Sequence, residues 1–170
     1  MPNLFMVMLG GRHLHAFTEV HDVVMAVGDS LEEIYPQLQQ VWFAEPKGLH
    51  IDAWARIHGI CHEGQNYQIQ FTHTQPESSD LKLYLVNLGG YSAAQFGELH
   101  RYELVLAQNA QDAKRQAKQL YIKHWQKPHV DAVIDVDDCF EIEQVAGCYV
   151  HLVPGDFASS VWENCYIVLS

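Results

Sequence analysis

The alternation of apolar and polar residues predicts a chain of short strands interrupted by two helices. Largely apolar runs of strand length occupy residues 4–9 and 83–88, and two glycines follow each run. Such a run is typical of a strand that is buried on both faces. Residues 19–27 and 98–106 place polar and apolar side chains on alternate faces, which is the pattern of a half-buried strand. Each half of the chain therefore begins with two predicted strands.

A helical stripe follows these strands in each half and predicts helices over about 31–44 and 110–124. Ser30 and Glu33 form the S-x-x-E pattern of a capping box at the first start. Pro36 either kinks this helix or marks a later start, with an irregular turn before it. The apolar positions are Ile34, Leu38, Val41 and Trp42 in the first stripe and Ala113, Ala117, Leu120 and Tyr121 in the second.

Two further strands are predicted after each helix, at residues 50–57 and 67–71 and again at 129–136 and 148–153. Each half therefore has the order ββαββ. The chain ends in "CYIVLS", which predicts an additional strand without a counterpart in the first half.

The two halves also match residue by residue. "LFMVMLGG" matches "LYLVNLGG", "FTEVH" matches "FGELH", and "HIDA" matches "HVDA", all at one constant separation. Three matches in one register indicate an internal duplication. We expect a first repeat at residues 1–79 and a second repeat with a C-terminal extension at 80–170, folded as one compact unit. The predicted class is α+β, with two ββαββ-type repeats packed about a pseudo-twofold and a mostly antiparallel sheet.

Composition narrows the classes of partner. The chain has 170 residues, of which 48% are hydrophobic and 18% charged, and its formal net charge is −11. So acidic a chain is repelled by nucleic-acid phosphates and anionic membranes, so neither is an expected partner. Four cysteines without C-x-x-C spacing, and no signal peptide, indicate free thiols and a cytoplasmic protein. A small-molecule ligand and a homo-oligomer both stay open, and no cofactor is indicated.

The segments "LGGR", "EVHDVVMAVGDSLEE" and "KGLHIDAW" resemble a family of bacterial proteins known as domain-of-unknown-function family 1543. Proteins of that family carry the domain once or twice. The resemblance is close over about residues 4–71 and weaker over 83–153, where "GDSLEE" and Trp42 have no match. It implies a bacterial origin and a tandem pair of domains, and it implies no activity.

The repeated polar residues are the candidates for a ligand-binding site. Two imidazoles and two carboxylates could bind zinc, manganese or iron, or could form an acid–base pair. The structural alternative is a set of carboxylates that orient histidines at strand starts. The sequence assigns none of them as a metal ligand or catalytic residue. The candidates are Glu19, His21, His50 and Asp52 in the first repeat and Glu98, His100, His129 and Asp131 in the second.

Strand geometry argues against one site that contains all four side chains of a repeat. His21 is expected on the apolar face of its strand, whereas His50 and Asp52 are expected opposite the apolar face of theirs. The four could meet only where the strand ends curl toward each other. The Gly10–Gly11 and Gly89–Gly90 pairs are expected to form turns that need a positive φ.

Two functions are consistent with this sequence. We favour a non-catalytic ligand- or protein-binding module built by duplication, because no catalytic triad or phosphate-binding loop is present. The alternative is a small metal-assisted or His-Asp hydrolase-like enzyme that uses His50 and Asp52. Convergence of the four polar side chains of a repeat around an open pocket would favour the enzyme.

Overall fold

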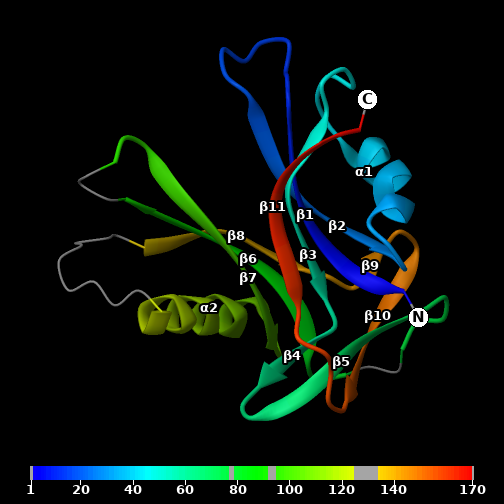
Figure 1. Ribbon diagram of the computed structural model, residues 1–170. Coiled ribbons are helices and arrows are strands. Elements are labelled where there is room, and N and C mark those ends of the chain that lie inside the picture. Colours follow the sequence, from blue (N-terminus) through cyan, green and yellow to red (C-terminus); the bar gives the residue numbers. More distant parts are fainter. Residues whose placement is uncertain (1, 77–78, 92–94, 125–133, 170) are drawn as a thin grey trace. The chain divides into compact units, whose positions relative to one another are not determined.

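The computed structural model describes residues 2–76, 79–91, 95–124 and 134–169 (Figure 1). Within these residues the strands form three antiparallel sheets. The chain divides into two compact units. The first unit comprises Met1–Gln75 together with Gln144–Ser170, and the second unit comprises Pro76–Glu143. An α+β protein with antiparallel sheets was predicted, and the sheets confirm this.

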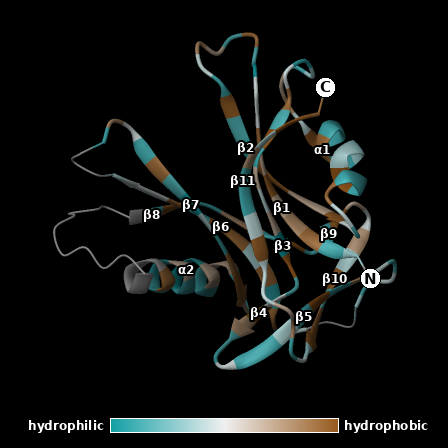
Figure 2. Ribbon diagram, in the orientation of Figure 1, coloured by the Kyte–Doolittle hydropathy of each residue, from teal (hydrophilic) through white to brown (hydrophobic). Residues whose placement is uncertain are grey.

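The main sheet of the first unit has the strand order β11-β3-β1-β2. The apolar run at the start of the chain forms its centre, as predicted from the absence of polar side chains. Figure 2 shows that β1 has mostly hydrophobic colours, whereas the β5 strand is mostly hydrophilic. The strands are β1 (Asn3–Gly11), β2 (Val20–Gly28), β3 (His50–Ile57) and β11 (Val161–Val168).

A short helix covers one face of this sheet. Pro36 stands in the first turn of α1 (Tyr35–Val41), and a 3-10 turn, η1 (Glu32–Ile34), precedes it. Of the two predicted alternatives, the later helix start is therefore the correct one, because proline fits the first turn, where its missing N–H costs nothing. The side chains of Ile34 and Leu38 are fully buried against the sheet. Burying each contributes roughly 1.5–3 kcal/mol.

The second unit repeats this arrangement with the strand order β7-β6-β8. Helix α2 (Ala110–His124) packs on its sheet through Ala113 and Ala117, as predicted, and both are fully buried. The pairing of β6 with β7 has the same register as that of β1 with β2, shifted by the repeat separation. The strands are β6 (Lys82–Tyr91), β7 (Glu98–Ala107) and β8 (Ile134–Glu141).

The third sheet joins a hairpin from each repeat and belongs to the first unit. Its order, β4-β5-β10-β9, places the two hairpins symmetrically about the β5–β10 pair. Both hairpins turn through two residues with positive φ, Glu63-Gly64 and Ala146-Gly147, which is the conformation of a type I′ turn. The strands are β4 (Gly59–His62), β5 (Gln65–Thr72), β9 (Gln144–Val145) and β10 (Cys148–Pro154). Each repeat is thus ββαβββ, one strand longer than predicted.

The division between units falls elsewhere than the predicted boundary between residues 79 and 80. Residues after Gln144 belong with the first unit, because β10 pairs with β5 and β11 pairs with β3. The additional terminal strand predicted from "CYIVLS" is β11. Among the described residues, no helix is long and apolar enough to cross a membrane.

Candidate functional site

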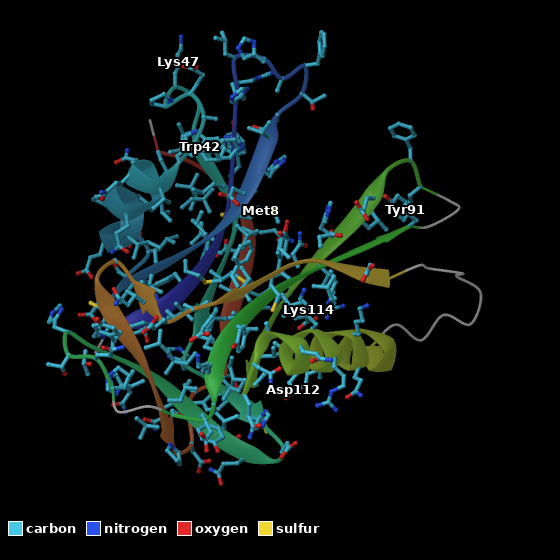
Figure 3. The ribbon with its side chains drawn as sticks, turned by 180° about the vertical axis from the view of Figure 1, so that it is seen from behind. Met8, Trp42, Lys47, Tyr91, Asp112 and Lys114 are labelled. Carbon is cyan, nitrogen blue, oxygen red and sulfur yellow. The ribbon has the colours of Figure 1, made fainter. Side chains whose placement is uncertain are left out.

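The polar residues of the first repeat meet above Gly10. Gly10 pairs with His21 on β2 and with His50 on β3. Directly paired residues of neighbouring antiparallel strands project from the same face of a sheet. The two imidazoles therefore flank a position without a side chain. This face lies opposite α1, since a side chain at Gly11 would contact Trp42 at the end of that helix (Figure 3).

A β-bulge brings Asp52 into the same group. Met8 pairs with Ala53 but Leu9 pairs with Ile51, so Asp52 is an extra residue in β3. A bulge of this kind changes the direction of side chains and shifts which residues share a face. Ile51 consequently packs in the core beneath α1, whereas His50 shares the opposite face with Ala53. The expectation that His21 and His50 lie on faces that prevent convergence was therefore wrong.

We call Glu19, His21, His50 and Asp52 the first cluster. Nε2 of His50 lies 3.0 Å from Oε1 of Glu19 and 3.3 Å from Oδ1 of Asp52. Nε2 of His21 lies 3.1 Å from Oδ2 of Asp52 and 3.9 Å from Oε2 of Glu19. The four side chains thus form a closed ring in which each imidazole nitrogen faces two carboxylates.

His50 is held in one orientation from two sides. Its Nδ1 lies 2.8 Å from the carbonyl oxygen of Gly48, which fixes the proton of a neutral imidazole on Nδ1. The ring of Tyr166 stacks on the imidazole at a centroid separation of 4.3 Å. Only 1% of the His50 side chain is exposed, whereas 41% of Glu19 and 47% of His21 are. The ring of donors is therefore closed on one side and open to solvent on the other.

Two atoms of the first cluster are buried without a hydrogen bond. They are Nε2 of His50 and Oδ2 of Asp52, whose close neighbours do not have hydrogen-bond geometry. With its proton on Nδ1, the His50 Nε2 lone pair faces the lone pairs of Glu19 and Asp52. This arrangement is repulsive unless a positive charge intervenes. A second proton on His50 would satisfy Nε2 and the two oxygens that face it, whereas a bound cation could also satisfy Oδ2 of Asp52.

Gly10 makes room for the first cluster. A Cβ at this position would lie 2.5 Å from Oδ2 of Asp52 and 2.6 Å from Nε2 of His50. No side chain fits at that separation, so glycine is required here for space.

Gly10, Gly11, Gly89 and Gly90 all lie within strands, and none of them is among the residues with positive φ. The predicted Gly-Gly turns were therefore wrong.

A second cluster forms at the equivalent place in the second unit. The donor atoms of Glu98, His100 and Asp137 all lie within 4.8 Å of one another. Nε2 of His100 is 3.2 Å from Oδ2 of Asp137 and 3.8 Å from Oε2 of Glu98. Gly89 again leaves the space, because its Cβ would lie 2.4 Å from Asp137.

Two of the predicted residues, His129 and Asp131, lie outside the described residues. Strand pairing places other residues at the positions equivalent to His50 and Asp52. Gly89 pairs with Asp135, and Asp137 is the extra residue of a β-bulge in β8. Asp135 and Asp137 therefore correspond to His50 and Asp52. The sequence contained a signal for this, since "DVD" repeats the spacing of "HID", but the identical "HVDA" concealed it.

Cys165 is not part of the first cluster, because it packs against the core on the α1 face of the sheet. Its Sγ lies 3.7 Å from the carbonyl oxygen of Ile51, to which it donates. Burial raises the pKa of this thiol, and the charges of Glu163 and Asp52 raise it further. The donor set of the first cluster is therefore two imidazoles and two carboxylates.

The nitrogen–oxygen separations in this donor set are close to those between the ligands of one metal ion. Among the described residues, the group whose donor atoms all lie within 4.8 Å of one another is the second cluster and not the first. Zinc bonds to nitrogen and oxygen are about 2.0–2.2 Å long, so tetrahedral ligand atoms are separated by roughly 3.3–3.6 Å. The nitrogen–oxygen separations around the first cluster run from 3.0 to 3.9 Å. The same groups could also exchange protons.

A cavity of about 270 Å³ in the first unit lies elsewhere, with His58 and Phe157 in its lining.

Comparisons with known proteins agree with the duplication. The chain is similar to protein Il1583 of Idiomarina loihiensis, whose crystal structure matches with a TM-score of 0.74 at 29% identity and covers 100% of this chain and 99% of that one. No curated protein matches it. The sequence model described as "Domain of Unknown Function (DUF1543)" matches residues 16–71 and again 95–146. These two segments span more than half of the sequence, one in each repeat, and the chain therefore belongs to the DUF1543 family.

Proposed function

We propose that the protein is a metal-binding module in which the first cluster holds one divalent transition-metal ion. The observation that carries this proposal is the buried Nε2 of His50, which faces two carboxylates without a hydrogen bond. A metal ion would use that lone pair and both carboxylates at once. The carbonyl of Gly48 would then act as the outer hydrogen-bond acceptor that metal-binding histidines usually have.

The competing explanation is a proton-stabilised network, in which a charged His50 bonds to Glu19 and Asp52. That network needs a charged imidazole in a side chain that is 1% exposed. Neutral His21 can direct its own Nε2–H toward Oδ2 of Asp52, 3.1 Å away, so that contact requires no additional proton. A single divalent ion satisfies all four side chains without the additional proton on the buried His50, and this supports the metal site.

The donor types favour zinc-class ions over other metals. Calcium and magnesium prefer oxygen ligands only, whereas this cluster supplies two imidazole nitrogens. Copper(I) prefers thiolates, and the first cluster contains no cysteine, since Cys165 packs against the core on the α1 face. Two imidazoles with two carboxylates suit zinc, manganese and iron(II). The net charge of −11 also raises the local concentration of cations around the chain.

The test is zinc titration of chelator-treated protein by calorimetry, together with elemental analysis before the treatment. We expect one tight zinc equivalent in the natural chain and none in His50→Ala. Saturating zinc at about 100 times Kd should stabilise the natural chain by about 2.7 kcal/mol, which raises Tm by roughly 5–10 °C. Affinity should fall as the solution is made more acidic, since protons compete with the metal for its ligand atoms.

The control variant is His73→Ala, which removes an exposed histidine of the same unit. It should retain both the zinc equivalent and the zinc-dependent rise in Tm. His50→Ala will lower Tm without zinc, because it removes a buried ring, so the diagnostic quantity is the shift that zinc causes. A natural chain that takes up no zinc, manganese or iron, with Tm unchanged by each, would contradict the proposal.

A further inference from the structure

The two clusters differ at one strand position. Gly10 pairs with His50 in the first unit, and Gly89 pairs with Asp135 in the second. The other three positions carry the same residue types in both clusters. Asp135 is not part of the second cluster, whose close donor atoms belong to Glu98, His100 and Asp137. The second cluster therefore has three donors where the first has four.

Asp135 is directed to helix α2 instead. Nζ of Lys118 lies 3.0 Å from Oδ1 of Asp135, and the backbone N–H of Val136 donates to the same oxygen at 2.8 Å. The carboxylate is thus already paired with a lysine. Figure 3 shows Lys114 on the same helix.

The strand order explains why Asp135 can turn away and His50 cannot. β8 ends the order β7-β6-β8, so a side chain at its start can reach past the strand to α2. β3 instead lies between β1 and β11, and Tyr166 of β11 stacks on the His50 ring. In the first unit this position is enclosed, and in the second it lies on an edge strand, with 79% of Asp135 exposed.

Glu98 of the second cluster also has a partner within the chain. The phenol of Tyr91, at the end of β6, donates a hydrogen bond to the Glu98 carboxylate. Lys118 and Tyr91 together give the carboxylates of this region partners that the first cluster lacks.

We propose that Asp135 is the residue that confines tight zinc binding to the first repeat. It replaces the fourth ligand by a shorter carboxylate that Lys118 holds away from the cluster. This inference rests on the proposed function, because it assumes that the first cluster binds zinc. It makes a separate claim, which is that one imidazole at position 135 completes a second site.

The test installs that imidazole. Asp135→His should raise zinc uptake from one equivalent per chain to two, and His50→Ala combined with Asp135→His should restore one equivalent to a chain that had lost it. The restored site should bind zinc about 10–100-fold more weakly than the first cluster, because β8 lacks an enclosing strand to orient the ring. Asp135→Ala is the matched control and should leave uptake at one equivalent.

Each result bears on one of the two proposals. If the natural chain binds one zinc and both Asp135→His variants remain folded by circular dichroism without an additional equivalent, this inference is overturned. An additional zinc equivalent in Asp135→Ala, equal to that in Asp135→His, also overturns it. The pairing of Asp135 with Lys118, and not the missing imidazole, would then be what blocks the second site. If the natural chain binds no metal, the proposed function is contradicted, and the inference about Asp135 loses its basis with it.

Discussion

At the scale of single residues, Gly10 determines whether the first cluster can form. The two flanking imidazoles and Asp52 occupy the volume that a Cβ would need. Glu19, His21, His50 and Asp52 could be predicted as a group, because they recur with the duplication and carry ligand atoms. The role of Gly10 could not, since its glycine pair also fits a turn, and only strand pairing shows which side chains stand beside it.

Gly10→Ala should weaken zinc binding by about 10–100-fold and destabilise the chain by about 1–3 kcal/mol, since the Cβ displaces Asp52 and His50. Calorimetric titration and urea unfolding measure the two effects. Gly11→Ala is the matched control, because its Cβ would lie 2.8 Å from Trp42 on the opposite face. It should cost similar stability and leave zinc affinity unchanged. Equal losses of affinity in both variants would refute a local role for Gly10.

At the scale of elements, the sequence predicts where β3 lies but does not predict the bulge within it. The predicted positions of β3 and α2 were close to those observed, because apolar spacing reports the period of a strand or helix. The bulge at Asp52 has no such signal, because one extra residue changes pairing without changing composition. The same limit applies to β8. The segment "HVDA" suggested that His129 and Asp131 are equivalent to His50 and Asp52, whereas strand pairing gives Asp135 and Asp137 as the equivalents.

Helix α2 packs on its sheet through small residues. Ala117 is fully buried against a core that includes Val86 and Leu88. Ala117→Leu should therefore destabilise the second unit by about 1–3 kcal/mol through overpacking. Gln119→Leu, at an exposed position of the same helix, should change stability by less than about 0.5 kcal/mol. Urea unfolding followed by circular dichroism distinguishes them, and equal midpoints would contradict the close packing of α2.

At the scale of the whole molecule, the duplication was visible in the sequence, but the contribution of second-repeat strands to the first unit was not. The matching segments "LFMVMLGG" and "LYLVNLGG" predicted two repeats packed as one compact unit. Strand pairing instead assigns β10 and β11 to the first unit. Pairing over such sequence separations depends on edges and register, which local apolar spacing does not report.

Deletion of residues 161–170 should abolish zinc binding and destabilise the first unit while the second unit persists. The deletion removes β11 and with it Tyr166, which stacks on His50, and Leu169, whose N–H bonds to the carbonyl of Leu49. Hydrogen exchange resolved by peptide would show loss of protection in β3. Protection in β6 should be unchanged. Full protection of β3 in the truncated chain would show that β11 is dispensable.

The pairing of β11 with β3 also constrains how the chain can be made in a cell. His50 is synthesised long before Tyr166, and the strand that encloses it is made only after the whole second unit. At about 5–20 residues per second, the nascent first unit waits several seconds with the β3 and β5 edges unpaired. Metal capture is therefore expected to follow the synthesis and pairing of β11, and chaperones would protect those edges until then.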